Sequence, residues 1–422
     1  MSRTPLTRAI LAIAFAGTGV AHATNGYFSH GYGVQSKGVA GAGVALAQDS
    51  LAAATNPAGL VDLGNRLDLG LEVFTPERGA EITGNAFGPD QHFEGNGTKS
   101  FYIPEFGYNR ALSPSLAVGL AVYGNGGMNT DYSSNPYARF GATGPAGINL
   151  EQLFITPAVA WRFAEGQSVG LALNLAYQTF EAKGISIFSG FSADPAHVSD
   201  NGTDSATGAG LRLGWQGRFG ERVTLGASWQ SKTLMSEFDK YAGLFADQGD
   251  FDIPETWTIG AAVKVTPKLT LLADYQHIAL SDIPAVGNSV STLFAGQPLG
   301  SDNGPGFGWD DVDVIKLGVI YQATPSLTLR AGYSDLDQPI PAGETFFNIL
   351  APGVVEKHYT IGGSFAVNEK NAVSLFVAHM PEVSVKGRNS IPPGFPPAGL
   401  GGGNANLHME ENSFGIAWQR KL

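Results

Sequence analysis

The stretch RLDLGLEVFT, residues 66–75, alternates apolar side chains with charged, small or aromatic ones. The apolar side chains share one parity and belong to Leu67, Leu69, Leu71 and Val73. Successive side chains along a strand point to opposite faces. The period of two therefore predicts a β-strand with one face suited to lipid and the other suited to a lumen.

The same period returns along the whole chain and predicts about fourteen strands, although counts of twelve and sixteen also fit. The candidate strands begin near Arg66, Phe101, Ser115, Glu151, Ser168, Gly208, Val223, Glu255, Lys268, Val312, Leu327, Glu356, Ala372 and His408. Tight connections alternate with long ones, which pass through Asn85, Asn135, Asp194, Leu244, Asn288, Phe346 and Pro393. Outer-membrane barrels have short periplasmic turns and long external loops, whereas a secreted β-sandwich has no reason to alternate in this way.

The composition agrees with a membrane barrel. The 422 residues include 57 glycines, no cysteine and only 15% charged residues. Beyond the first residues no apolar run approaches the roughly 18 residues of a spanning helix. Strands of a closed barrel need apolar residues on one face only, so we expect an all-β, transmembrane antiparallel β-barrel. Aromatic residues at strand ends predict an interfacial belt and comprise Trp161, Phe163, Trp215, Phe219, Tyr321 and Trp418.

The first residues carry the features of an export signal. Arg3 and Arg8 precede the apolar run Ala9–Val20, and Ala21-His22-Ala23 follows. A basic start, a short apolar run and an A-x-A site predict a cleaved signal peptide over residues 1–23. The alternative, an uncleaved anchor, would need a longer apolar run.

Residues 24–65 have no clean period of two and are rich in small residues. Irregular backbone cannot face lipid, but a barrel of about fourteen strands has a lumen wide enough to hold such a segment. Asn56-Pro57 is a turn signal within it. We therefore expect three regions: the signal peptide, a small N-terminal plug over residues 24–65, and the barrel over residues 66–422.

The segment NGYFSHGYGVQSKGVAGAGVALAQDSLAAATNPAGL, residues 25–60, resembles the N-terminal hatch of the FadL/TodX family, outer-membrane transporters of long-chain fatty acids and hydrocarbons. The ordered features are Gly38–Gly43, Val44–Ala47, Asp49 and the triplet Asn56-Pro57-Ala58. The resemblance continues through YIPEFGYNRALSPSLAVGL, DQPIPAGETFF and VSVKG, so it covers nearly the whole mature chain.

The resemblance implies a transport route. External loops catch an apolar molecule, a pocket in the upper barrel holds it, and it leaves sideways, beside an inward kink in the third strand, after the hatch rearranges. By the strand count this strand is Ser115–Tyr123, and Gly119 is the candidate for the kink and the lateral gate. A plain lumen-facing glycine predicts the same sequence. The hatch residues implied are Asp49, Asn56, Pro57 and Ala58.

Apolar and charged residues suggest where a ligand binds. Three long links are apolar, around Phe245, around Phe346-Phe347 and over Ile391–Leu400, and we expect either an entry surface or a lid. Parity places charged side chains in the lumen, namely Glu72, Arg212, Asp274 and Lys316, with Arg162 and Arg330 nearer the periplasm. These charges could receive a carboxylate, or they could pair with one another or with the hatch. The ligand-binding candidates are Phe28, Phe140, Phe245, Phe346, Phe347, Arg212 and Lys316. The acidic stretch Gly308–Asp313 argues against an anionic ligand.

Other function classes find little support. The chain has no G-x-S-x-G elbow, no H-x-x-x-H spacing and no nucleotide loop, so we expect neither an enzyme nor a bound metal or cofactor. The formal net charge of −12 disfavours nucleic acid as a partner. The hypothesis is a monomer in the bacterial outer membrane that admits hydrophobic compounds, first of all long-chain fatty acids, by hatch-gated passive diffusion. The alternatives are an importer of neutral hydrocarbons, a general porin and an adhesin. Expected partners are the hydrophobic ligand, outer-membrane lipid and the outer-membrane assembly machinery.

Overall fold

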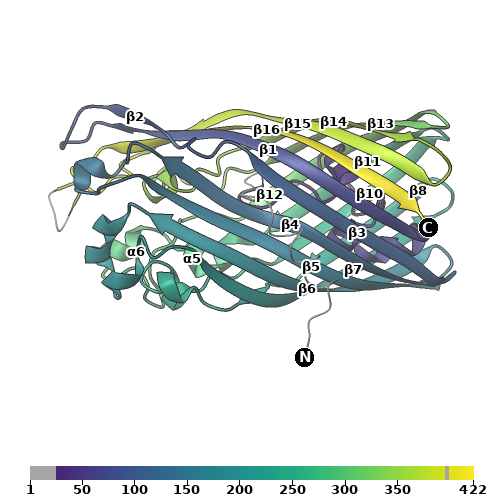
Figure 1. Cartoon of the computed structure of the whole chain (residues 1–422), viewed down its shortest axis with the longest axis horizontal. Coiled ribbons are helices and arrows are strands. Elements are labelled where there is room, and N and C mark those ends of the chain that lie inside the picture. The colour runs from purple at the N-terminus through teal and green to yellow at the C-terminus, as the bar shows by residue number, and fades with distance from the viewer. Residues whose placement is uncertain (1–24, 395–398) are drawn as a thin grey trace.

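The computed structural model describes residues 25–394 and 399–422, which form a closed antiparallel β-barrel (Figure 1). The predicted signal peptide lies outside the described residues. Within them, fourteen strands build the barrel wall. They are β1 (Arg66–Thr83), β3 (Phe101–Ser113), β4 (Leu116–Tyr132), β5 (Ala146–Ala164), β6 (Gln167–Lys183), β7 (Asp204–Phe219), β8 (Val223–Gln230), β10 (Thr256–Thr266), β11 (Leu269–Ile278), β12 (Val312–Thr324), β13 (Leu327–Leu336), β14 (Lys357–Ala366), β15 (Asn371–Val385) and β16 (Asn404–Lys421).

Neighbours in sequence are neighbours in the wall, and β1 pairs with β16 to close it, from Arg66 opposite Lys421 to Thr83 opposite Asn404. The prediction of about fourteen strands is confirmed, and each strand begins within a few residues of its predicted start. Two short strands were not predicted: β2 (Gln91–Glu94) pairs with β1, and β9 (Leu234–Met235) pairs with β7.

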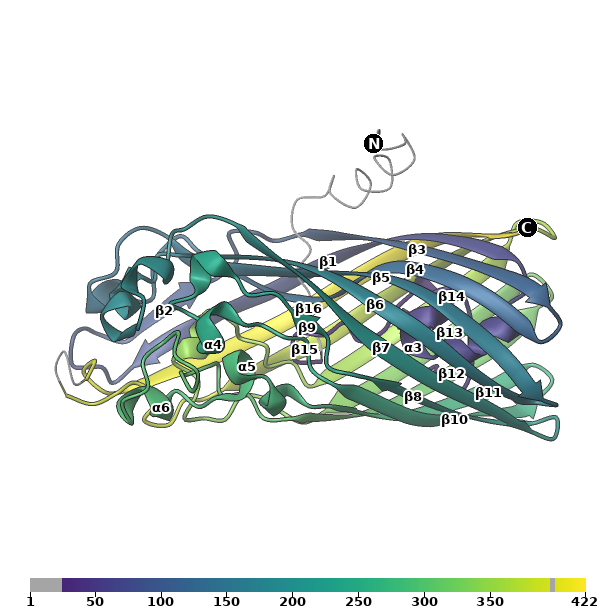
Figure 2. The ribbon, with the colours of Figure 1, turned by 90° about the horizontal axis from the view of Figure 1, so that it is seen from below.

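Short and long connections alternate, as predicted, so the long loops gather at one end of the barrel and the tight turns at the other (Figures 1 and 2). The long loops carry one-turn helices: η2 (Ala138–Phe140), η3 (Ser186–Phe191), η4 (Pro195–His197), η5 (Asp239–Tyr241), α4 (Ala246–Gly249), η6 (Leu280–Asp282), α5 (Pro284–Gly287), α6 (Ser291–Phe294) and η7 (Phe347–Ile349). Among the described residues, no helix has both the length and the apolar character needed to cross a membrane.

The polarity of the two faces of the wall reverses along the strands. Toward the tight turns the outward face is apolar and the inward face polar, as for Phe414 and Ile416 against Ser413 on β16. Toward the long loops the outward face is polar and the inward face apolar, as for His408 against Leu407. The apolar outward band marks the depth of the hydrocarbon layer, and the strands beyond it extend into water.

The N-terminal segment, residues 25–65, packs inside the barrel. It contains α2 (Val34–Lys37), α3 (Ala52–Thr55) and η1 (Pro57–Asp62). Figure 2 shows α3 within the ring of strands, in the half nearer the tight turns. Only an element inside the ring can contact so many strands at once: η1 contacts β4 to β7, and α2 contacts β14 to β16 on the other side.

Candidate functional site

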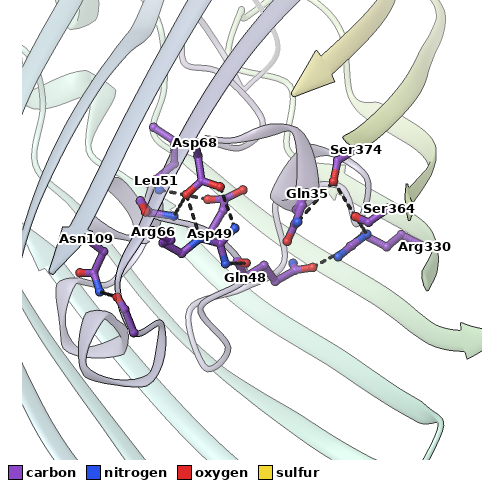
Figure 3. Close-up of polar contacts among 12 residues, drawn as sticks. Gln35, Gln48, Asp49, Leu51, Arg66, Asp68, Asn109, Arg330, Ser364 and Ser374 are labelled. Atoms are coloured by element: carbon purple, nitrogen blue, oxygen red, sulfur yellow. Dashed lines mark hydrogen bonds and ion pairs between the residues drawn. The ribbon is translucent and has the colours of Figure 1, made fainter. Parts of the chain in front are cut away.

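Polar side chains of the wall hold the N-terminal segment in the half of the lumen nearer the tight turns, which we call the lower lumen (Figure 3). Gln35 Nε2 lies 3.3 Å from Ser374 Oγ, and Arg330 Nε donates to Gln48 Oε1 at 2.7 Å. The Asp68 carboxylate accepts the Ser50 backbone N–H at 2.9 Å and also pairs with Arg66 at 2.7 Å. These bonds join buried and half-buried polar groups of the segment to named positions of the wall, so the contacts favour one position and register of the segment.

An ion-pair triad lies at the centre of this contact. Lys37, the only lysine or arginine between residues 24 and 65, contacts Glu72 of β1 and lies 2.9 Å from Glu105 of β3. Ser413 of β16 also donates to Glu72, and the Gly33 backbone N–H donates to Glu105 at 3.2 Å. All three charged side chains are almost completely buried. A buried charge without a partner is very costly, so the triad strongly favours the docked position.

The other lumen charges also bind the N-terminal segment, which confirms one of the two readings of the sequence. Arg212 donates to Gln230 and, at 3.5 Å, to the Thr55 carbonyl. Lys316 donates to the His30 carbonyl at 3.0 Å. The remaining contacts join Asp274 to the Gly43 and Val44 backbone N–H groups at 2.7 and 2.9 Å, and Arg162 to Asp62 at 2.5 Å. Arg212 and Lys316 therefore both contact the segment, and their role in ligand binding stays a prediction.

Asn56 connects three parts of the molecule. Its amide donates to the Val44 carbonyl at 2.7 Å and to the Trp215 carbonyl of β7 at 2.9 Å. Its carbonyl accepts the Ala58 N–H at 3.1 Å and so caps η1, with Pro57 at the first position. Asp49 accepts the Leu51 N–H at 3.0 Å. The residues of the predicted hatch motif thus stabilise turns of the segment and join one of them to the wall.

The wall is incomplete between β3 and β4. Their pairing runs from Ser113 opposite Leu116 to Phe106 opposite Val122 and goes no further among the described residues, although β4 continues to Tyr132. The pairing of β4 with β5 shifts register between Gly124 and Gly126. This irregularity lies in the third barrel strand, beyond Gly119, which pairs regularly with both neighbours. The gate at Gly119 stays a prediction.

The beginning of the N-terminal segment takes the place of β3 beside β4. Ser29 N–H donates to the Asn125 carbonyl at 3.0 Å, and Gly127 N–H donates to the Tyr27 carbonyl at 2.9 Å. Phe28, predicted as a ligand contact, forms a bridge with Gly126 here and is buried. These backbone bonds cover an edge that would otherwise present unpaired groups.

The other half of the lumen, nearer the long loops, is called the upper lumen here. It is filled by the long loops rather than by the N-terminal segment. An apolar cavity of about 40 Å³ lies between them. Its lining comes from two strands and from distant loops and comprises Ile148, Phe180, Ile185, Phe188, Leu244, Phe245, Ala285, Leu299, Pro305, Gly306, Phe307, Phe347 and Leu350. None of these described lining residues is charged. Two of the loops expected to form an entry surface or a lid, those around Phe245 and around Phe346-Phe347, fold in over the lumen, and we call the loop residues of this lining the lid. The third, over Ile391–Leu400, includes residues 395–398, which lie outside the described residues.

The predicted ligand aromatics divide between the cavity and its surroundings. Phe245 and Phe347 line the cavity. Phe346 is 1% exposed and packs edge to face on Tyr137 and Phe140 at ring distances of 5.5 and 5.6 Å. Phe28 lies at the β4 edge, and Arg212 and Lys316 lie in the lower lumen. The structure therefore brings some of the predicted set together and separates the rest.

The stretch Gly308–Asp313 does not make the cavity acidic. Asp310 and Asp311 are exposed. Trp309, just before them in the chain, is buried, and its indole N–H donates to Asn348 Oδ1 at 2.5 Å. These aspartates do not line the cavity, so the argument from this stretch against an anionic ligand does not apply there.

In the loop before β10, burial and the nearby charge of Asp252 raise the pKa of Asp250 to about 7.

A model of the OMPP1/FadL/TodX outer membrane transport proteins matches residues 16–391. The chain belongs to this family. Members transport hydrophobic compounds across the outer membrane, and the family is a transport family rather than an enzyme class. The search of curated proteins found no match.

Solved structures with the same fold are distant in sequence. The Pseudomonas putida toluene transporter TodX is 17% identical, with a TM-score of 0.69 over 93% of this chain and 99% of that one. A Pseudomonas aeruginosa FadL homologue is 14% identical, with a TM-score of 0.69 over 94% and 99%. The Ralstonia pickettii toluene transporter TbuX is 18% identical, with a TM-score of 0.64 over 93% and 99%. At these identities the likeness shows the fold alone.

For this FadL/TodX family member, sequence reasoning missed several residues of the site. Phe180 and Phe188 line the cavity, and Asn125 lies at the irregular point of β4. A signal for Phe180 was present, because it has the inward parity of β6 beyond the apolar outward band. A signal for Lys37 was present as well, since it is the single basic residue of a segment expected to meet acidic lumen residues.

Proposed function

We propose that the chain carries neutral hydrocarbons across the outer membrane, with the apolar cavity under the lid as the binding pocket. The absence of charge among the described lining residues is the observation that carries this proposal. A fatty acid would need a donor for its carboxylate, because burying an unpaired charge is very costly. The cations that could supply one, Arg212 and Lys316, are bound to the N-terminal segment.

The comparisons support the same choice of cargo. Two of the solved structures with this fold are described as toluene transporters, and another as a monoaromatic hydrocarbon channel. Aromatic side chains of the lid offer faces and edges suited to a ring. Long-chain fatty acids are the alternative, and they become an outcome of the test below.

Binding requires the lid to move. The cavity of about 40 Å³ is smaller than the roughly 150 Å³ that holds benzene in an apolar protein interior. A ring can enter only when side chains of the lid shift outward. We infer that the structure represents a closed state and that the loops open by separating apolar contacts.

We place the exit at the incomplete part of the wall. Tyr27 to Ser29 cover the free edge of β4 with a few backbone hydrogen bonds. Withdrawal of this short stretch would leave β3 and β4 unpaired above Phe106, so an apolar molecule could leave toward lipid. In this scheme residues 24–65 act as the hatch, the irregularity at Gly124–Gly126 replaces Gly119 as the gate candidate, and the carrier works as a monomer in contact with lipid. We also propose that the outer-membrane assembly machinery inserts the barrel into the membrane.

The test compares two cargoes of the same ring size, toluene and benzoate, with oleate as a third. Uptake is measured in an outer-membrane transport mutant that expresses the chain or carries an empty vector. We expect faster uptake of toluene only. Ile148→Asn places an unpaired polar group in the cavity and should lower toluene uptake roughly tenfold or more, whereas Ile148→Val should leave it nearly unchanged. Equal uptake of benzoate or oleate would contradict the neutral cargo, and leakage of small sugars would favour the general porin.

A further inference from the structure

Two histidines and a glutamate from distant parts of the chain lie together on the outward face of the wall, and none of them lines the lid cavity. His92 and Glu94 belong to β2, and His408 belongs to β16. The strand β1 lies between them and pairs with both, so that Gly79 is opposite Glu94 on one side and opposite His408 on the other. The topology therefore gathers the three side chains over one point of the sheet.

The three side chains face one another, with their ligand atoms close enough together to bind one metal ion. His92 Nε2 lies 2.6 Å from Glu94 Oε1, and the two imidazole rings stack at 5.0 Å with an angle of 15° between their planes. One ligand atom from each residue lies within 4.8 Å of the others. A side chain at Gly79 would come within 2.7 Å of the His408 ring, so this glycine provides the space in which the imidazole lies.

The surroundings are acidic and open to water. The three residues lie in a cavity of about 440 Å³ that is also lined by two basic residues, Arg78 and Lys386. Its carboxylates are those of Glu77, Glu81, Glu94, Glu382 and Glu410. On β16 the apolar outward residues begin at Phe414, six residues nearer the tight turns, so the cluster stands well clear of the hydrocarbon layer. A dissolved cation can therefore reach it and is attracted to it.

We propose that His92, Glu94 and His408 form a binding site for a divalent cation of the zinc type. Two imidazole nitrogens and one carboxylate oxygen are a ligand set of zinc sites that keep a fourth position for water. Calcium and magnesium prefer oxygen ligands alone, so an acidic patch without histidines would suit them better. Ligands about 2 Å from the ion lie roughly 3.3 Å apart, a separation that exposed side chains can reach by small rotations.

A cation here would join β2 to the last strand of the barrel across β1. The hairpin that contains β2 is also attached by a four-residue ladder from Gly79–Glu94 to Ile82–Gln91 and by backbone hydrogen bonds of Gly95 and Gly97 to Arg78 and Asp131. The site is independent of the cargo proposal, because it lies outside the barrel. Its expected consequence is a more firmly held external hairpin when the cation is bound.

The experiment uses the full chain in detergent, dialysed against Zn²⁺ with the bound metal then measured. We expect one tightly bound Zn²⁺ per chain. His92→Ala and His408→Ala should each weaken it by more than the roughly 10–100-fold that loss of an outer-shell partner costs. The matched control is His197→Ala, which removes a histidine held 2.6 Å from Asp194 without a second imidazole, and it should bind as before.

A second readout tests the location. Zn²⁺ should slow hydrogen exchange of Gln91–Glu94 in the unchanged chain and in His197→Ala, but not in the His92→Ala/His408→Ala double variant. Heat-modifiable migration in gels shows that each variant barrel is folded. The proposal is overturned if the double variant keeps the bound Zn²⁺, if no equimolar Zn²⁺ binds, or if millimolar Mg²⁺ or Ca²⁺ displaces it.

Discussion

The lower and upper halves of the lumen are closed by opposite chemistry. Below, the N-terminal segment is held by ion pairs and hydrogen bonds, with Lys37 between Glu72 and Glu105. Above, the long loops meet through aromatic and aliphatic side chains, as Phe188 does with Phe347 at a ring distance of 5.2 Å. Polar contacts need one geometry, whereas apolar contacts exchange easily for other apolar contacts.

Under the proposed function, this difference would let one barrel exclude polar solutes and admit a hydrocarbon. A hydrocarbon can replace lid contacts at little cost, because it offers the same kind of surface. A hydrocarbon has no charged group that could replace Lys37 between the carboxylates of Glu72 and Glu105. The lower half should therefore stay closed to polar solutes while the upper half accepts cargo, and each prediction below tests one half against the other.

The largest effect is expected from Lys37→Met. The change leaves the buried Glu72 and Glu105 carboxylates without their cation, and breaking a buried pair in this way costs about 3–5 kcal/mol. The N-terminal segment should loosen, and leak conductance in planar bilayers should rise, while the barrel still shows heat-modifiable migration. Lys183→Met is the matched control, because that lysine is 42% exposed beside Asp131 and should contribute little.

A compensating variant sharpens this prediction. The triple variant combines Lys37→Met with Glu72→Gln and Glu105→Gln. It has no unpaired buried carboxylate, so its leak conductance should be lower than that of Lys37→Met alone. If the single change leaves conductance at the level of the unchanged chain, the triad does not hold the segment, and the contrast between the two halves fails.

The strands could be predicted because the membrane enforces a period of two. Three of them, β5, β7 and β16, begin four or five residues before the predicted starts. In β16 the added residues have the opposite polarity, with Asn404 and Asn406 outward and Ala405 and Leu407 inward. The alternation is still present there, but its sense reverses once the outside is water and the inside is an apolar lid.

The site was less predictable because its parts meet only in three dimensions. Parity correctly placed Arg212 and Lys316 in the lumen, yet it could not show that the N-terminal segment would engage them. The acidic stretch Gly308–Asp313 argues against an anionic ligand only if its aspartates face the ligand, and the fold of the loop decides which way they point. Gly119, Gly124 and Gly126 are all glycines on one strand, and only the strand pairing shows that the irregularity lies at the last two.

In the upper half, Leu299→Ala should affect the lid and leave the lower half unchanged. Leu299 is 3% exposed and lines the cavity, and such a change costs a buried leucine site about 2–5 kcal/mol. The cavity also grows toward a size that suits an aromatic ring. Hydrogen exchange should rise in the lid loops but not in the N-terminal segment, and leak conductance should stay low.

Leu375→Ala serves as the control for the lid variant, because Leu375 is 44% exposed on the outward face of β15. It should leave exchange in the lid unaltered. A rise of leak conductance in Leu299→Ala comparable to that of Lys37→Met would show that the two halves open together rather than separately.

A smaller effect in the lower half is expected from Asn56→Ala with Pro57→Ala. The change leaves the Val44 and Trp215 carbonyls without their donor, which costs about 1–3 kcal/mol, and removes the cap of η1. Conductance or cargo uptake should change less than in Lys37→Met, with barrel folding intact. Asn412→Ala, on the exposed outward face, is the control. Unchanged transport in the double variant would remove the proposed role of the turn.

The smallest expected effect concerns pH and the loop before β10. Burial and the charge of Asp252 raise the pKa of Asp250 from 3.8 to about 7, so the closed loop binds a proton more tightly than the open loop. The closed loop is therefore favoured most at low pH. That advantage declines as pH rises from about 4 to about 7 and is absent above this range.

Loop opening should consequently increase between pH 4 and pH 7 and then level off, measured by hydrogen exchange corrected for the intrinsic pH dependence of exchange. Asp250→Asn imitates the protonated acid and should reduce the dependence, with a remainder from Asp247, whose pKa burial also raises, whereas Asp239→Asn at the exposed start of η5 should keep it in full. A response that originates at Asp250 should be confined to the lid loops, because Asp250 lies in the lid half. A pH response of the N-terminal segment that disappears in Asp250→Asn would instead mean that a proton in the lid reaches the ion-pair triad, and the two halves would have to be treated as one coupled gate.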